Sequence, residues 1–103
     1  IERLGIAAEV NAKAIIIPSG TTANETVAGR AEIAVQQVSE LMLVRGIDLL
    51  GPLPDDLQDD VVFSGGLFKA APEAAQARGL LRHLAAPEHA PLYRNKGLEP
   101  VFG

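Results

Sequence analysis

The sequence lacks cysteine and tryptophan, and its aromatic side chains are limited to three phenylalanines and one tyrosine. Without cysteine, the chain has no disulfide, no zinc site with thiolate ligands and no thiol nucleophile. No apolar run approaches the ~18 residues that a membrane-spanning helix needs. The hydrophobic share of 48% is ordinary for a globular protein, so we expect a core built from Leu, Ile, Val and Ala.

Basic clusters are absent as well. The net charge of −4 arises from one acidic run, Asp55-Asp56-Leu57-Gln58-Asp59-Asp60, because the acids outside that run balance the nine bases. A chain without a basic patch and with little aromatic surface is not expected to bind nucleic acid. The acidic run lacks the ligand spacing of an EF-hand calcium loop, so it is predicted to be a solvated loop.

Short apolar segments predict the strands of the fold. Buried strands are expected at residues 14–17 and 33–35, a further strand at 61–63, and another apolar segment lies at 48–51. Helical patterns lie between them, including a short helical turn at residues 38–42. This alternation predicts an α/β class, with a mainly parallel sheet and flanking helices.

Two helix boundaries are marked by residue type. A helix capped by Thr21 or Thr22 is predicted to end near Ala28, with Glu25 completing a capping box with Thr22. Gly29 suits the left-handed position that follows a helix.

The C-terminal part of the chain predicts two more helices. Pro72 suits the first turn of a helix whose apolar stripe continues to Ala86. Pro87 begins a last helix that Gly97 ends, and Pro91 predicts a kink or a late start within it.

A proline-rich break, Pro52-Leu53-Pro54, separates two halves of different pattern. Residues 1–50 are predicted to belong to a ligand-binding lobe, residues 51–60 to a crossover linker, and residues 61–103 to another lobe with terminal helices. The chain starts at Ile1 rather than Met, and its first residues have the pattern of a helix interior, so residues are expected to precede it. The runs predicted to be buried strands need neighbouring strands, some of which would come from the residues expected to precede this chain. The chain is therefore predicted to associate with itself or to leave apolar surface exposed.

The order of these segments resembles a known family. Val27-Ala28-Gly29-Arg30-Ala31-Glu32-Ile33-Ala34-Val35-Gln36-Gln37-Val38-Ser39-Glu40-Leu41 resembles a helix–turn–strand in the second lobe of type 2 periplasmic solute-binding proteins of the molybdate-binding kind. Residues 46–54 resemble the family's return crossing, and residues 71–100 resemble its terminal helices. The resemblance covers nearly the whole chain and implies the C-terminal part of a two-lobed fold.

The resemblance also implies a function. It predicts the periplasmic solute-binding component of an ABC-type uptake transporter, holding a small anion (a molybdate-like oxyanion or a small organic acid) between two lobes and signalling to a membrane permease. On this interpretation the protein is not an enzyme and needs no cofactor. The alternative is the ligand-sensing effector domain of a transcriptional regulator with the same fold, and a third hypothesis is a small hydrolase built around Ser64.

Two segments are predicted to contact the ligand. Ser19-Gly20-Thr21-Thr22 precedes a helix, where unpaired N–H groups hold anions, and an ordinary helix cap is the alternative. Gln36 and Gln37 follow the second predicted strand, at the carboxyl end where α/β sheets bind ligands. The resemblance places a ligand donor at Gln37, or at Gln36 if the alignment slips by one, and a pair of polar residues at a strand edge is the alternative.

No metal site is predicted. His83 and His89 are six residues apart, whereas a helical metal-binding pair is spaced four apart, so both are interpreted as surface histidines. Ser39 and Ser64 lie in no nucleophile elbow, and no base adjoins them in the sequence.

Overall fold

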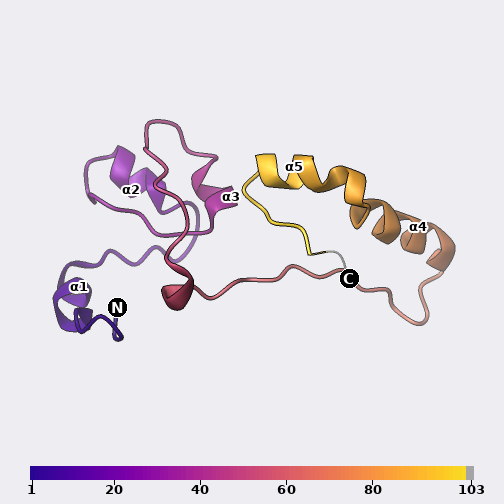
Figure 1. The fold of residues 1–103 in the computed structure, drawn as a ribbon, viewed down its shortest axis with the longest axis horizontal. Coiled ribbons are helices and arrows are strands. Elements are labelled where there is room, and N and C mark those ends of the chain that lie inside the picture. Colours follow the sequence, from indigo (N-terminus) through magenta and orange to yellow (C-terminus); the bar gives the residue numbers. More distant parts are fainter. Residues whose placement is uncertain (102–103) are drawn as a thin grey trace. The chain divides into compact units, whose positions relative to one another are not determined.

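The computed structural model describes residues 1–101 (Figure 1). The chain divides into two compact units, with the boundary between Leu49 and Leu50. The first unit contains α1 (Ala7–Lys13), α2 (Ala23–Val27) and α3 (Val38–Leu41). The second contains a 3-10 turn η1 (Asp55–Leu57), α4 (Ala74–Leu84), a 3-10 turn η2 (Pro87–His89) and α5 (Ala90–Asn95). The assignment of the two halves to separate lobes and a linker stays a prediction.

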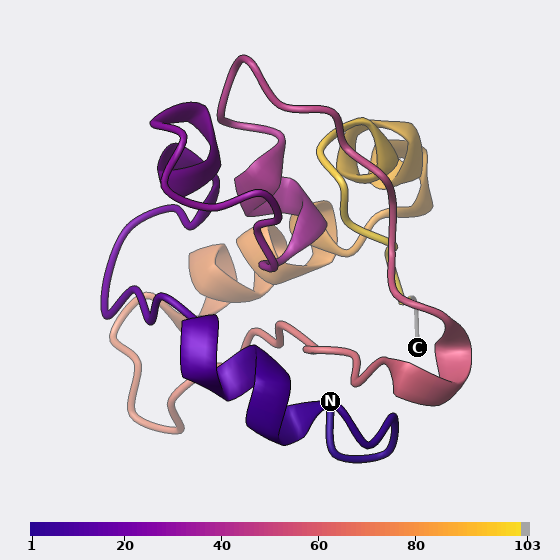
Figure 2. The same cartoon turned by 90° about the vertical axis from the view of Figure 1, so that its left-hand side faces the viewer.

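The predicted α/β class with a mainly parallel sheet is wrong for this chain. Residues 1–101 contain no strand, and every segment expected to be a strand is coil (Figures 1 and 2). The reason is that an apolar run becomes a strand only when a neighbouring backbone accepts and donates its ladder hydrogen bonds. The sequence pattern identified segments suited to a sheet but could not supply the partners.

Helix ends, by contrast, follow local residue type. Gly29 has φ +72°, its N–H donates to the Thr26 carbonyl, and the Arg30 N–H donates to the Glu25 carbonyl. This pair of bonds is a Schellman motif, which the predicted glycine stop requires. Gly97 ends α5 with the same pattern, since Gly97 and the residue after it donate back to Arg94 and Tyr93.

Some helix starts differ from prediction. The helix expected over residues 1–10 begins only at Ala7, because Gly5 adopts φ +69° and the preceding residues form a turn. Thr22 occupies the N-cap of α2, but its side chain makes no capping bond, and Glu25 instead pairs with Arg30. The capping box is therefore absent. The late start predicted from Pro91 is confirmed, because Pro91 lies in the first turn of α5.

Very little of this chain is buried. Among the described residues, the buried apolar side chains are Ala23 and Leu41 in the first unit and Ala90 in the second. Ile16, Leu50 and Phe68 are instead 83%, 90% and 88% exposed. No helix within residues 1–101 combines the length and the hydrophobicity needed to cross a membrane.

A hydrogen bond within the second unit gives a first testable prediction. The Tyr93 hydroxyl donates to the Leu84 carbonyl at 2.6 Å and so joins α5 to the end of α4. Tyr93→Phe is expected to lower the free energy of unfolding by about 0.5–1.5 kcal/mol, towards the lower figure because water can replace the lost donor. Urea unfolding followed by circular dichroism measures the change. An unchanged or raised free energy of unfolding would contradict the role of this bond.

Candidate functional site

The two segments predicted to contact the ligand lie together in the first unit, joined through the Gln36 side chain. The Gln36 Oε1 accepts hydrogen bonds from the Thr22 N–H at 2.9 Å and from the Thr22 hydroxyl at 3.2 Å. The Gln36 Nε2 donates to the Gly20 carbonyl at 3.1 Å. One amide therefore bridges Gly20 and Thr22 within the loop of residues 19–22, and we call this arrangement the Gln36 latch.

The loop beside the latch keeps backbone donors available. Gly20 adopts φ +85°, a conformation that a side chain would strain, and no other heavy atom lies within 4 Å of its missing Cβ. Within residues 1–101, the N–H groups of Gly20 and Thr21 donate to no protein acceptor, whereas the Thr22 N–H is already bound by Gln36. Successive N–H groups around a left-handed residue form a concavity that suits an anion.

The remaining predicted residues have other roles. Ser19 is exposed and makes no hydrogen bond within the described residues. Gln37 is the N-cap residue of α3, and its carbonyl accepts the N–H groups of Glu40 and Leu41. The Gln37 side chain is partly buried and makes no capping bond, so its amide stays available. The structure thus joins Gln36, rather than Gln37, to the loop.

The helix dipole contributes less than the sequence suggested. α2 has only five residues, so its N-terminal end carries little of the aligned dipole of a long helix. The loop is also held by the Thr22 hydroxyl, whose single proton is shared between Gln36 Oε1 and the Val35 carbonyl at 3.3 Å, and by Asn24, whose side chain donates to the Thr21 hydroxyl at 2.7 Å. Anion binding here must therefore depend on the loop N–H groups and on side-chain donors.

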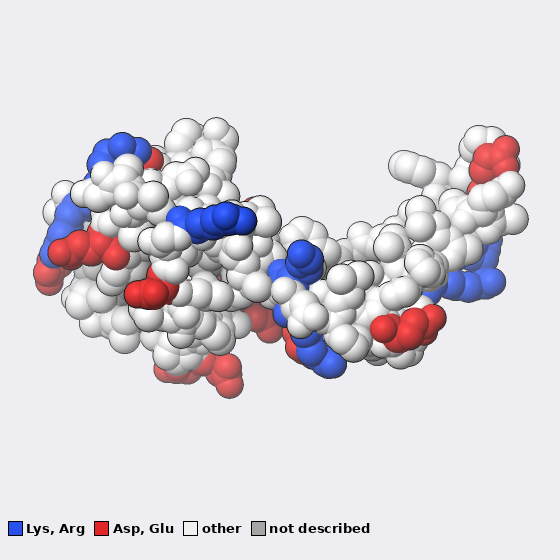
Figure 3. Space-filling view, turned by 90° about the horizontal axis from the view of Figure 1, so that it is seen from above, with Lys and Arg blue, Asp and Glu red and all other residues white. Residues whose placement is uncertain are grey.

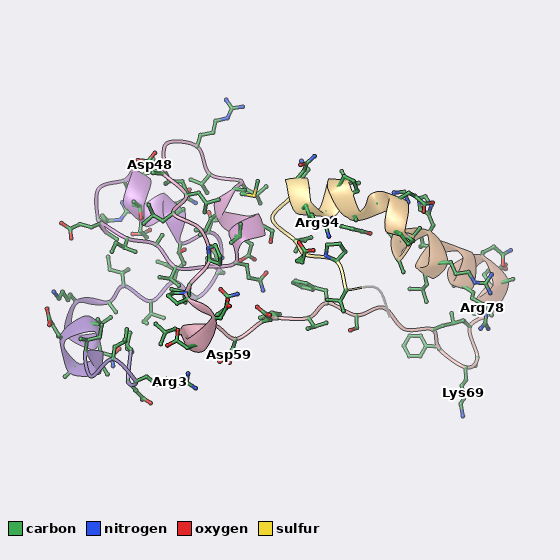
Figure 4. All side chains as sticks on the ribbon, in the orientation of Figure 1. Arg3, Asp48, Asp59, Lys69, Arg78 and Arg94 are labelled. Atoms are coloured by element: carbon green, nitrogen blue, oxygen red, sulfur yellow. The ribbon has the colours of Figure 1, made fainter. Side chains whose placement is uncertain are left out.

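The arginine that follows α2 is already paired with a carboxylate. Arg30 makes two hydrogen bonds to the Glu25 carboxylate, at 2.6 and 2.8 Å, beyond the far end of α2. In the second unit, Arg94 projects from α5 and pairs with Glu99 at 2.7 Å (Figure 4). On the face shown in Figure 3, Lys and Arg side chains are interspersed with Asp and Glu. The Arg30 guanidinium is therefore already engaged by a carboxylate.

The Arg30–Glu25 pair gives a pH-dependent prediction. The hydrogen bond from Arg30 holds the pKa of the Glu25 carboxyl below its usual value of 4.5. A carboxyl whose pKa is lowered on folding stabilises the folded state above its unfolded pKa, and the contribution is lost as pH falls through the folded pKa. The melting temperature of Arg30→Gln should therefore lie slightly below that of the parent at pH 7, and the difference should shrink as the pH falls below 4.5. A difference that persisted unchanged at pH 3 would contradict this origin.

A shallow hollow elsewhere is a poor alternative site. It is lined by Gly66, Leu67 and Phe68 in the second unit, and these residues offer no polar side chain to orient a ligand. The predicted hydrolase also finds no support in this geometry, because Ser64 has no hydrogen-bonded base within the described residues. The loop at residues 19–22 with Gln36 is therefore the best candidate in residues 1–101.

Comparisons with known proteins place the sequence among binding proteins. Residues 1–99 match the family described as bacterial extracellular solute-binding protein. Aconitate isomerase of Pseudomonas sp. is 37% identical to this chain over 90 residues, which are 87% of the chain and 34% of that protein. The chain thus spans about a third of the length of this curated relative. No solved structure matches it.

These findings confirm part of the resemblance and correct another part. A solute-binding family is confirmed, but neither match names molybdate. The prediction that the protein is not an enzyme is wrong on this comparison, because a relative at 37% identity is named as an isomerase. That prediction rested on the resemblance to solute-binding proteins and on the absence of a catalytic constellation within 103 residues. An active site between two lobes can take its reacting groups from the other part of a longer chain.

Proposed function

Because the chain belongs to the bacterial extracellular solute-binding protein family, we propose that its full-length protein binds a small polycarboxylate of the aconitate type. In this proposal the loop of residues 19–22 holds one carboxylate group. The observation that carries it is the pair of unbound N–H groups at Gly20 and Thr21, beside the Gln36 latch. Hydrogen bonds to a charged acceptor are stronger than those between neutral groups, so two such donors can orient a carboxylate.

The number of donors limits what this part of the protein can bind. Aconitate carries three carboxylates, whereas Gly20, Thr21 and the side chain of Gln37 offer a few neutral donors. Desolvating several negative charges without cations is costly. The other carboxylates are therefore assigned to residues outside this chain, on the facing side of a two-lobed cleft.

A second function, isomerisation of the bound acid, is favoured by the relative named Aconitate isomerase. In such a reaction this loop would hold one carboxylate in place, while groups outside residues 1–103 move protons. Fixing the substrate beside a proton-transferring group is itself a large part of catalysis. The loop would then be a substrate-positioning element.

Besides isomerisation, the bound solute could serve in uptake, and the family match supports this function. In this proposal the full-length protein lies in the periplasm and presents its ligand to the membrane permease of an ABC transporter. The predicted molybdate-like oxyanion ranks below a carboxylate, because the relative is named for a carboxylate substrate.

Titration calorimetry on the full-length protein tests the proposed ligand. Aconitate isomers, citrate, molybdate, sulfate and phosphate are compared, and tight binding is expected only for the polycarboxylates. Incubation with a single aconitate isomer, followed by proton NMR, distinguishes catalysis from binding alone. Molybdate binding without carboxylate binding would overturn the proposal.

A further inference from the structure

The two histidines of the chain contact each other in the second unit, although they are six residues apart in the sequence. His83 lies in the last turn of α4, and His89 ends the 3-10 turn η2. Their rings have centroids 4.4 Å apart, with the planes at 72°. The His89 Nε2 lies 3.3 Å from the His83 Nδ1. The spacing rule for a single continuous helix does not apply, because the chain turns between the two residues.

The turn that joins them is held by backbone hydrogen bonds. The Ala86 N–H donates to the His83 carbonyl at 3.1 Å, and the His89 N–H donates to the Ala86 carbonyl at 3.0 Å. Pro87 fixes the first residue of η2, and Tyr93 binds the Leu84 carbonyl. The ordered backbone therefore keeps the two histidines close to each other, while their solvent-accessible rings can reorient around a shared ion.

The separation of the two nitrogens fits a shared metal ion. Two imidazole nitrogens at about 2.0–2.1 Å from a tetrahedral ion lie roughly 3.3–3.4 Å apart. The same two nitrogens lie within hydrogen-bond distance of each other, with the donor set by the tautomer of each ring, so a shared ion would replace the proton between them. His83 is exposed and His89 is partly exposed, so solvent reaches the pair.

We propose that His83 Nδ1 and His89 Nε2 together bind one divalent transition-metal ion of the kind that prefers imidazole, such as Zn²⁺, Ni²⁺ or Cu²⁺. Within residues 1–101, no group of three or more His, Cys, Asp or Glu side chains is placed to hold a metal. The remaining coordination positions are therefore filled by water or by a group that the metal recruits. Imidazole selects these ions over Mg²⁺ and Ca²⁺, which prefer oxygen ligands. The proposal is independent of the carboxylate loop, which lies in the other unit.

Calorimetric titration of the tag-free chain with ZnCl₂ and NiCl₂, in a non-coordinating buffer, tests the proposal. One ion per chain is expected, with no heat from MgCl₂ or CaCl₂. Removing either ligand from a two-ligand chelate leaves a single imidazole, so His83→Ala and His89→Ala should each weaken binding by at least about ten-fold. If both histidines bind the same ion, each single variant should lose nearly as much metal affinity as the variant in which both histidines are replaced by alanine.

A matched variant separates the chelate from metal binding elsewhere. Tyr93→Phe keeps both histidines but loosens the turn, and it should weaken Zn²⁺ binding by less than either histidine substitution. Circular dichroism checks that α4 and α5 persist in every variant. Unchanged zinc affinity in His83→Ala or His89→Ala would overturn the proposal, as would two ions per chain with independent losses.

Discussion

In isolation, the 103-residue chain is expected to bind a hydrophobic dye strongly and to associate with itself. Its accessible surface is 8766 Å² at a mass of 10.8 kDa. Two compact monomers of half this mass would together expose about 6,700 Å². Any contact between the units would reduce the total accessible surface. The excess of roughly 2,000 Å² over two compact monomers therefore belongs to the units themselves. A stable protein interface buries about 1,600 Å², which is less than this excess.

Part of the exposed apolar surface lies in the apolar segments of the predicted strand pattern, at Ile16, Ile33, Val35, Leu50 and Phe63. Phe68, Leu43 and Val101, outside these segments, are also highly exposed. Within the described residues, the backbone of the segments expected to be strands makes no ladder hydrogen bonds, so another chain can pair with it. Dye fluorescence and light scattering across a concentration series measure the two effects.

Substitution of the exposed apolar residues provides the control. Leu50→Ser and Phe68→Ser, at positions 90% and 88% exposed, should reduce dye binding and association while the helical circular dichroism is retained. The full-length protein, whose other part should cover this surface, should bind little dye. A clean monomer without dye binding, found for the isolated parent chain, would contradict the prediction.

The second large effect is expected from Gln36. Gln36→Leu removes the acceptor of the Thr22 N–H and the donor to the Gly20 carbonyl, so the loop loses its latch. At about 0.5–1.5 kcal/mol for each lost bond, ligand affinity of the full-length protein should fall on the order of 10- to 100-fold. Titration calorimetry with the polycarboxylate that binds best measures the loss.

Two further variants distinguish a side chain that holds the loop in place from a side chain that donates directly to the ligand. Gln36→Glu keeps an acceptor for the Thr22 N–H, but it removes the donor to the Gly20 carbonyl and adds a negative charge beside the proposed anion, so it should weaken binding at least as much. Gln37→Leu leaves the latch intact and tests the Gln37 side chain as a ligand donor. Full affinity in Gln36→Leu combined with lost affinity in Gln37→Leu would assign the site to Gln37 and contradict the latch.

The sequence alone determined those features that depend on neighbouring residues. The stops at Gly29 and Gly97 were predictable, because glycine adopts positive φ at little cost and the motif closes within six residues. The late start at Pro91 followed from its missing N–H. The order of the segments was also sufficient to recognise a solute-binding family, now confirmed over residues 1–99.

Contacts between distant residues were decided only by the tertiary structure. Apolar runs predicted a sheet, yet a strand needs ladder partners that its own residues do not encode, and residues 1–101 form none. The pattern could not tell whether Gln36 or Gln37 meets the loop, because adjacent residues differ only in the direction that the folded backbone gives them. The contact of His83 with His89 likewise depends on the turn between α4 and η2, which periodicity along a single helix does not describe.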